Sequence, residues 1–271
     1  DIIGAKFVRE IENGEIIIIS EKGMESIRPF PKVAERPCIF ERIYFSRPDS
    51  MLGGNTVYSY RKNLGIELAK EHQVDADIVV PVPDSGVPAA LGYAQQSSMP
   101  FELGIIRNHY VGRTFIEPSQ SIRQFGVKLK HNANVSYIKN KKVILIDDSI
   151  VRGTTAKKII KMIYDAGAKE VHLGIACPPI KHPDFYGIDT PDYNELIASK
   201  NNIEEINKAI GSKSLFFLSL EGTYQAMGYD SRNPDQPQFT DHCFTGEYPT
   251  SLIDREKGNI SKQFSLLTEK N

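Results

Sequence analysis

The sequence has few cysteines, lacks long apolar runs and carries no excess of charge of either sign. Its three cysteines, Cys38, Cys177 and Cys243, are widely spaced and form no Cys-x-x-Cys pair, which is typical of a reducing compartment. The longest apolar runs, such as 16–19 and 143–146, fall far short of the ~20 residues that a membrane helix needs. A net charge of −1 argues against nucleic acid or a membrane as a partner. The sequence therefore predicts a soluble cytoplasmic protein.

The 271 residues correspond to one large domain or two modest ones. An apolar fraction of 40% with 25% charged residues is enough to bury a core, which excludes a wholly disordered chain. The first residue is Asp1 rather than Met, and nothing like a signal peptide follows it. We therefore expect the chain to be a piece of a longer protein.

Short apolar runs alternate with amphipathic segments from residue 77 onward. The runs predict strands at 77–83, 101–106, 143–146, 171–176 and 215–218. The amphipathic segments predict helices at 88–96, 155–166, 194–198, 203–210 and 222–227. Because the strand runs are continuously apolar, the sequence predicts an α/β domain with a mainly parallel sheet flanked by helices on both faces.

The first 50 residues are rich in strand signals and proline. β-branched residues predict a strand at 15–19 after an Asn-Gly turn, and alternation predicts another strand at 39–45. Two glycines then predict a loop, with Asn55 as the N-cap of the next helix. That helix has one apolar face, formed by Val57, Tyr60, Leu64 and Leu68.

Residues 107–140 show no clean period, and their first part is basic. From 107 to 131 there are five Arg or Lys and one acid, Glu117, in a chain whose net charge is −1. Long aperiodic loops in compact domains are commonly lids or binding loops, so we favour a flexible loop over 107–131 that covers an anion. A solvated loop, with or without a hairpin, is the alternative.

The most informative segment is 143–155, an apolar strand that ends in Asp147 and Asp148. A loop of Ser, Gly and Thr then opens a helix, and its N–H groups and the helix dipole suit a phosphate at the carboxyl end of a strand. The two carboxylates would repel that phosphate unless they face sugar hydroxyls or Mg²⁺. The segment is neither a dinucleotide fingerprint nor a P-loop. Solvated acids beside an ordinary helix cap are the alternative.

A second turn between a strand and a helix covers residues 81–88. Pro83 ends the strand, and Gly86 permits an unusual backbone angle. The N–H groups of this turn and the Ser85 hydroxyl would hold a second anion beside the first, and ordinary turn chemistry is the alternative. Together the two segments predict a ligand with a phosphate, a diol and a second anion with metal. Phosphoribosyl pyrophosphate (PRPP) has that layout.

The segment 146–155 (IDDSIVRGTT) resembles the PRPP signature of type I phosphoribosyltransferases. Further segments look like the glutamine phosphoribosylpyrophosphate amidotransferase family, namely 39–50, 80–86, 108–130, 178–190 and 243–250. The resemblance covers nearly the whole chain. It implies a type I phosphoribosyltransferase domain over 41–229, a short β-rich remnant of a glutaminase domain over 1–40 and a C-terminal tail over 230–271.

Residue by residue, the resemblance implies that Asp147 and Asp148 hold the ribose hydroxyls and bound Mg²⁺, with Ser85 near the metal. The cradle of the 5′-phosphate would consist of Ser149, Val151, Arg152, Gly153, Thr154 and Thr155. The pyrophosphate loop would consist of Asp84, Ser85 and Gly86. Residues 110–116 would belong to the flexible loop, which closes over PRPP and helps to form an ammonia channel. Two residues of this loop would take part in catalysis, namely Tyr110 and Arg113.

The sequence departs from that family in two places. The family's glutaminase domain starts with a cysteine nucleophile, which this chain does not have at its start, so glutamine hydrolysis is expected to be absent. Some members also hold an iron–sulfur cluster with four cysteines. Cys38 and Cys243 match two of those positions, but Asp184 and Thr240 occupy the others, and two thiolates are too few, so no cluster is predicted.

The resemblance implies an enzyme that forms 5-phosphoribosylamine and pyrophosphate from PRPP and ammonia, the first committed step of purine biosynthesis. It also implies a homo-oligomer and feedback inhibition by purine nucleotides. A base-salvage phosphoribosyltransferase is disfavoured because the segments outside the PRPP signature match the amidotransferases. A PRPP-sensing regulator would need a basic face that binds nucleic acid, and a net charge of −1 does not indicate such a face. A folded but inactive fragment is a third alternative.

Overall fold

The computed structural model describes residues 4–108, 131–188, 190 and 192–252. The chain divides into two compact units, residues 1–37 with 233–239 and residues 38–232 with 240–271. Most of the predicted flexible loop, including Tyr110 and Arg113, lies outside the described residues.

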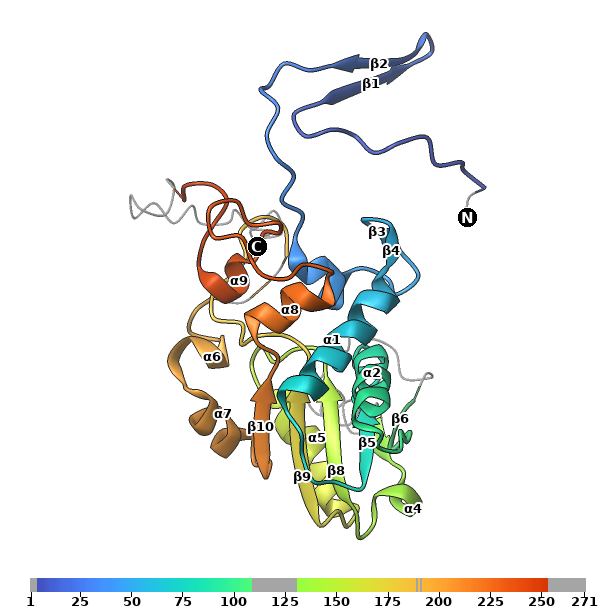
Figure 1. Ribbon diagram of the computed structural model, residues 1–271, viewed down its shortest axis with the longest axis vertical. Helices are drawn as coiled ribbons and strands as arrows, with labels where there is room; N and C mark the ends of the chain where they lie inside the picture. Colours follow the sequence, from blue (N-terminus) through green and yellow to red (C-terminus); the bar gives the residue numbers. More distant parts are fainter. Residues whose placement is uncertain (1–3, 109–130, 189, 191, 253–271) are drawn as a thin grey trace, which may run out of the picture. The chain divides into compact units, whose positions relative to one another are not determined.

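The smaller unit contains an antiparallel hairpin of β1 (Ile16–Ser20) and β2 (Gly23–Ile27), drawn in dark blue in Figure 1. The strand predicted at 15–19 corresponds to β1, whereas β2 has no sequence signal because its apolar residues fall on opposite faces of a strand. Many large apolar side chains of this unit are exposed, namely Phe7, Val8, Ile11, Ile16, Ile18, Ile19, Met24, Ile27, Phe30 and Val33. A two-stranded hairpin with so much exposed apolar surface is marginally stable by itself.

The larger unit is built on a four-stranded parallel sheet in the order β10-β9-β8-β5 (Figure 1). Its strands are β5 (Ile78–Pro81), β8 (Lys142–Asp147), β9 (Glu170–Ile175) and β10 (Ser214–Phe217). Nearly every residue in them is buried, as continuous apolar runs predict for strands covered on both faces. The prediction of an α/β fold with a mainly parallel sheet is confirmed.

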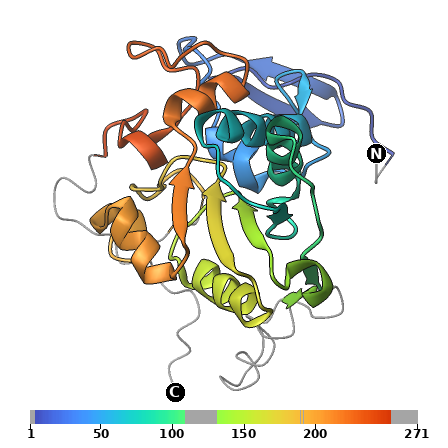
Figure 2. The ribbon, with the colours of Figure 1, turned by 60° about the horizontal axis from the view of Figure 1, so that its bottom comes forward.

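Helices cover both faces of this sheet. In Figure 1, α1 (Val57–Glu71) and α2 (Val87–Ser97) lie in front of the sheet, and α5 (Thr154–Asp165) lies behind it, where the turned view of Figure 2 shows it clearly. α7 (Ile203–Ile210) packs against α5 and the edge strand β10. The apolar face predicted for α1 is buried, which confirms that helix.

α1 and α2 approach closely because each has a glycine at the contact. A Cβ on Gly65 would lie 1.8 Å from the carbonyl oxygen of Ala89, and a Cβ on Gly92 would lie 1.9 Å from that of Lys62. Both neighbours are backbone atoms that cannot rotate away. The spacing of the two helices therefore depends on these two glycines.

The start of α1 differs by one residue from the sequence prediction. Thr56 rather than Asn55 is the N-cap, and its Oγ1 accepts a hydrogen bond from the Ser59 N–H at 3.1 Å. Asn55 belongs instead to β4 (Asn55–Thr56), which pairs with β3 (Met51–Leu52). Two glycines with φ angles of 57° and 84° join these strands, a conformation that glycine adopts without strain.

Residues 39–45 form a helical segment rather than the predicted strand. Two helical residues lead into η1 (Glu41–Phe45), a π-helical turn in which the Ser46 N–H donates to the Glu41 carbonyl at 3.1 Å. The buried apolar side chains recur at helical spacing, namely Ile39, Phe40 and Ile43. The strand prediction was wrong because so short a segment does not separate the helical period from alternation.

Short elements complete the larger unit. They are β6 (Ile105–Arg107), β7 (His131–Ala133), α4 (Val135–Ile138), α6 (Ile197–Lys200), α8 (Leu220–Ala226) and α9 (His242–Thr245). β6 and β7 pair antiparallel, so Arg107 and His131 are direct neighbours. The strand predicted at 101–106 is only partly correct. Phe101 makes a single bridge to the parallel sheet, and the chain then turns so that β6 pairs with β7.

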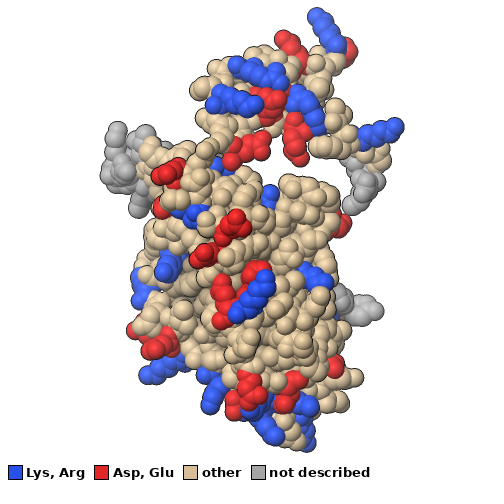
Figure 3. All heavy atoms as spheres, in the orientation of Figure 1, with Lys and Arg blue, Asp and Glu red and all other residues tan. Residues whose placement is uncertain are grey.

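Charged side chains of both signs are interspersed on the face drawn in Figure 3, in agreement with the net charge of −1. They gather where β8 and β9 begin, at the bottom of that view. Within the described ranges, no helix is both long enough and apolar enough to cross a membrane.

We expect Gly65→Ala to lower the free energy of unfolding by about 2–3 kcal/mol, because α1 and α2 must move apart to admit the methyl group. In a helix interior, alanine has a more favourable helix propensity than glycine by about 1 kcal/mol. A loss of stability in Gly65→Ala would therefore come from the steric conflict and not from helix propensity. Urea denaturation of both proteins measures the difference.

Lys70→Ala, at an exposed position of the same helix, is the matched control and should change stability by less than about 0.5 kcal/mol. A Gly65→Ala protein as stable as its parent would contradict the close helix contact.

Candidate functional site

The carboxyl ends of β5 and β8 meet at the same edge of the sheet. Pro81 pairs with Ile146, and the Val82 N–H donates to the Ile146 carbonyl at 2.9 Å. Because the strands are parallel, the turn after β5 and the loop after β8 leave the sheet together. Ligands of open α/β sheets bind at such carboxyl ends.

A cavity of about 820 Å³ lies at this edge. Its described lining contains every predicted phosphate- and metal-site residue except Gly86, namely Asp84, Ser85, Asp147, Asp148, Ser149, Val151, Arg152, Gly153, Thr154 and Thr155. It also contains residues that we had not predicted as site residues, among them Phe40, Tyr44, Phe45, Arg107, Ile188 and Thr190. Tyr110 and Arg113, the predicted catalytic residues, lie outside the described residues.

Asp147 and Asp148 bring two carboxylates to this cavity. The Asp147 carboxylate accepts the Asp148 N–H at 2.9 Å, and the Asp148 carboxylate accepts the Ser149 hydroxyl at 2.6 Å. Neither carboxylate forms an ion pair with a Lys or Arg of the described residues, although Asp148 is only 6% exposed. Burial, together with the neighbouring Asp148 carboxylate, raises the pKa of Asp147 well above its ordinary value. Such a pair suits a divalent cation or the hydroxyl groups of a sugar.

The loop from Ser149 to Thr155 presents N–H groups that have no protein acceptor in the described part of the structure. The first bond at the start of α5 is donated by Lys157 to the Gly153 carbonyl, so the preceding N–H groups are available to a ligand. Gly153 is the N-cap with a φ of 75°, a backbone angle that favours glycine. The N-terminus of a 12-residue helix with these donors suits a phosphate.

The outer side of this loop is tied to the segment around α6. The Ile197 N–H donates to the Val151 carbonyl at 2.9 Å. Arg152 donates to one carboxylate oxygen of Glu195 from Nε at 2.8 Å and from Nη2 at 2.5 Å. These bonds fix the loop without using its N–H groups.

Residues 83–85 of the turn after β5 also line the cavity. Gly86 has an ordinary φ of −76°, so the unusual backbone angle that glycine permits is not used here. Glycine is required there for space, because a Cβ would lie 2.4 Å from the Ile146 carbonyl oxygen. The peptide bond before Asp84 is cis, and the N–H groups of Asp84 and Ser85 have no acceptor among the described residues. The turn therefore offers a second set of donors to an anion.

Aromatic side chains give the cavity an apolar side. They come from η1 or directly precede it, namely Phe40, Tyr44 and Phe45. Arg61 of α1 is only 4% exposed and holds the end of η1, because its Nη2 donates to the Ser46 carbonyl at 2.7 Å and its Nε to the Arg42 carbonyl at 3.2 Å. The position of the aromatic side chains thus depends on a buried guanidinium of another helix.

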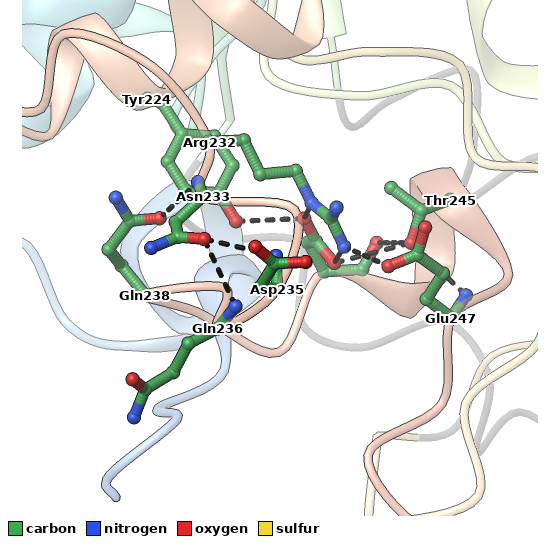
Figure 4. A network of polar contacts seen from close by, with 9 residues as sticks. Tyr224, Arg232, Asn233, Asp235, Gln236, Gln238, Thr245 and Glu247 are labelled. Carbon is green, nitrogen blue, oxygen red and sulfur yellow. Dashed lines mark hydrogen bonds and ion pairs between the residues drawn. The ribbon is translucent and has the colours of Figure 1, made fainter.

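A polar network around Asp241 supports a further part of the lining (Figure 4). Asp241 is fully buried and accepts hydrogen bonds from the Tyr224 hydroxyl at 2.8 Å and from Arg232 Nε at 2.6 Å. These bonds anchor α9, whose Cys243 carbonyl accepts two N–H groups of the segment 181–190. That segment supplies an isoleucine and a threonine to the cavity.

The four positions that hold cluster cysteines in the resembled family lie close together. Cys38 forms a bridge with Thr240, and Asp184 lies 2.8 Å from His242 Nε2. The side chains around them leave a second cavity of only about 10 Å³, and burial raises the pKa of the Cys38 and Cys243 thiols. In the described part of the chain, no three or more His, Cys, Asp or Glu residues are arranged to hold a metal ion. These residues therefore do not fit an iron–sulfur cluster.

Comparison with known proteins gives consistent matches. A family model described as the phosphoribosyl transferase domain matches residues 61–207. The amidophosphoribosyltransferase of Rhizobium etli is 59% identical over 273 residues, covering 98% of this chain and 55% of that protein. The amidophosphoribosyltransferase of Bacillus subtilis is 50% identical over 254 residues, covering 93% of this chain and 53% of that protein.

A solved structure is similar over the same region. It is the glutamine phosphoribosylpyrophosphate (PRPP) amidotransferase from B. subtilis complexed with ADP and GMP, with a TM-score of 0.82 and 49% sequence identity. The match covers 92% of this chain and 55% of that chain. The chain thus spans about half the length of the curated relatives that it matches.

The raised pKa of Asp147 makes stability depend on pH. The folded protein retains a proton there that the unfolded chain releases above about pH 4, the ordinary pKa of aspartate. The ionised carboxylate therefore destabilises the ligand-free fold at neutral pH, and this effect fades as the pH falls towards 4. We expect Asp147→Asn to raise the melting temperature at pH 7 and to lose that advantage on acidification, as measured by thermal unfolding without ligand.

Asp165→Asn is the control, because it removes an exposed carboxylate that is paired with Lys161 and should give no gain at either pH. A melting temperature of Asp147→Asn at or below that of the parent at pH 7 would contradict the strained carboxylate pair.

Proposed function

The chain belongs to the phosphoribosyl transferase domain family, and we propose that it is the transferase half of an amidophosphoribosyltransferase. Its larger unit has the type I phosphoribosyltransferase fold that the sequence predicted. The proposed reaction forms 5-phosphoribosylamine and pyrophosphate from PRPP and ammonia, the first committed step of purine biosynthesis. The observation that carries the proposal is a single cavity in which two turns with open N–H groups meet two carboxylates.

Each part of PRPP has a counterpart in this cavity. The open N–H groups of residues 149–155, with the hydroxyls of that loop and the dipole of α5, would bind the 5′-phosphate. Asp147 and Asp148 would accept hydrogen bonds from the ribose hydroxyls. The turn 84–86 would hold the pyrophosphate through the open N–H groups of Asp84 and Ser85.

The carboxylates also fit a divalent cation. Mg²⁺ is usually bound through one or two carboxylates together with phosphate oxygens of the substrate. Asp147 and Asp148 supply two carboxylates without ion-pair partners in the described ranges, and Ser85 supplies a hydroxyl on the neighbouring turn. Bound Mg²⁺ would neutralise negative charge on the leaving pyrophosphate.

The residues of the chain would position the substrates and stabilise charge, and they would not transfer protons. Breaking the bond between ribose C1 and pyrophosphate builds positive charge on the sugar, and ammonia supplies its lone pair without a base. The aromatic side chains from η1 give the cavity an apolar side that limits water as a competing nucleophile. The open N–H groups hold the anionic ends of PRPP during this exchange.

The domain organisation follows from the same proposal. Residues 1–40 would be the end of a glutaminase domain, 41–229 the phosphoribosyltransferase domain and 230–271 a tail. The exposed apolar side chains of the β1–β2 hairpin support this, because such a surface is rarely left open to solvent. From the sequence resemblance we also propose catalytic roles for Tyr110 and Arg113.

Further properties are proposed from the relatives. The structure of the B. subtilis enzyme with ADP and GMP supports purine nucleotides as feedback inhibitors of this chain. A homo-oligomer and a cytoplasmic location complete the proposal, although some plant relatives are described as chloroplastic.

We expect the 271-residue chain to release pyrophosphate from Mg²⁺-PRPP when ammonium is supplied at alkaline pH, where free ammonia is present. Glutamine should support no release, because the chain spans only about half the length of the amidophosphoribosyltransferases that it matches. An enzyme-coupled pyrophosphate assay with each nitrogen donor measures both outcomes.

Asp147→Asn combined with Asp148→Asn should reduce the release to background and abolish Mg²⁺-dependent PRPP binding, whereas Asp165→Asn should behave as the parent. PRPP binding without any release in the presence of ammonia would contradict the proposed reaction. Release with glutamine would contradict the expected loss of glutaminase activity.

A further inference from the structure

The turn that the proposed function assigns to pyrophosphate carries a carboxylate into the cavity. Asp84 lines the cavity, and its side chain is 53% exposed. An anionic side chain repels an anionic ligand in the same space unless a cation compensates it. A pyrophosphate-binding turn that contains Asp84 therefore needs a cation beside it.

Arg107 is placed to be that cation. It is the last residue of β6, it lines the same cavity, and its Nη1 forms an ion pair with Asp84 Oδ2. This is the one side-chain hydrogen bond that Arg107 makes with the described residues, so neither its Nε nor its Nη2 is used there. A guanidinium has five N–H donors in a planar fork, which allows it to bind a carboxylate and a phosphate at the same time.

The other arginine of the described lining is already engaged. Both Nε and Nη2 of Arg152 donate to the Glu195 carboxylate. His131, also in the lining, is a cation only when it is protonated. Of the two arginines, Arg107 uses only Nη1 towards the described residues, whereas Arg152 uses both Nε and Nη2 for Glu195.

We infer that Arg107 binds the pyrophosphate group of PRPP and that Asp84 orients its guanidinium; this inference rests on the proposed function. In that reaction the bond between ribose C1 and the pyrophosphate oxygen breaks, and its electron pair leaves with pyrophosphate. The ammonia lone pair forms the new C1–N bond, and the excess proton on nitrogen passes to solvent. Arg107 stabilises the negative charge that builds on the departing oxygens through charge-assisted hydrogen bonds.

Calorimetric titrations with Mg²⁺-pyrophosphate and with ribose 5-phosphate separate the two ends of the site. Arg107→Gln should weaken Mg²⁺-pyrophosphate binding by about 10- to 100-fold, the usual range for a lost hydrogen bond between charged groups. Ribose 5-phosphate, which lacks the pyrophosphate, should bind this variant as tightly as the parent. Arg107→Lys keeps the charge but loses the planar fork of N–H donors. Its affinity for pyrophosphate should therefore lie between those of the parent and Arg107→Gln.

Arg47→Gln is the matched control, because Arg47 is an exposed arginine that is paired with Asp49 and lies outside the described lining. It should change neither affinity. Unchanged pyrophosphate affinity in Arg107→Gln would overturn the inference. An equal loss for both ligands would also overturn it, because that result indicates general damage to the site.

If Arg107→Gln does not fold, Arg107→Lys takes its place in both titrations. Only a lower affinity for Mg²⁺-pyrophosphate with an unchanged affinity for ribose 5-phosphate supports the inference. A parent chain that does not bind Mg²⁺-pyrophosphate would overturn it as well. A parent that binds pyrophosphate through Arg107 but releases none from PRPP with ammonia would refute the proposed function alone.

Discussion

The pairing of β5 with β8 decides where each group of the candidate site lies. Pro81 lies beside Ile146, and the Val82 N–H is bound to the Ile146 carbonyl, so two turns far apart in the sequence leave the sheet together. One turn contributes the open N–H groups around Asp84, and the other contributes two carboxylates and the loop before α5. Residue 86 must be glycine, because any larger side chain would collide with the Ile146 carbonyl oxygen. A shift of one residue would reverse the faces of β8 and separate the two turns.

The polar groups at this edge lower the stability of the protein when no ligand is bound. Two adjacent carboxylates form no ion pair with a Lys or Arg of the described residues, and neighbouring N–H groups lack acceptors there. The Ile197 N–H ties the loop after β8, which carries these N–H groups. Arg61 fixes η1 and Asp241 anchors α9, which support other sides of the same cavity. A ligand with phosphate oxygens, hydroxyl groups and a divalent cation supplies the missing partners. The features that weaken the empty fold are thus the ones that bind such a ligand.

Sequence reasoning found the part of the site whose residues are neighbours in the chain. The acids, the small polar residues and the helix start of 147–155 form one continuous signal, and the structure places all of them around one cavity. The aromatic side chains were missed because alternation over 39–45 predicted a strand. The ion pair of Arg107 with Asp84 joins residues of different elements, and the reason for Gly86 is a carbonyl oxygen of another strand. Such contacts exist only once the sheet is assembled, so no local pattern indicates them.

One cavity is proposed to bind PRPP by both ends, with each end at its own turn. Hydrogen exchange of backbone amides in the presence of ribose 5-phosphate, Mg²⁺-pyrophosphate or Mg²⁺-PRPP tests this most directly. We expect ribose 5-phosphate to protect the amides of 149–155, pyrophosphate to protect those of Asp84 and Ser85, and PRPP to protect both segments. Absence of protection by PRPP at either segment, or the same pattern with all three ligands, would contradict it.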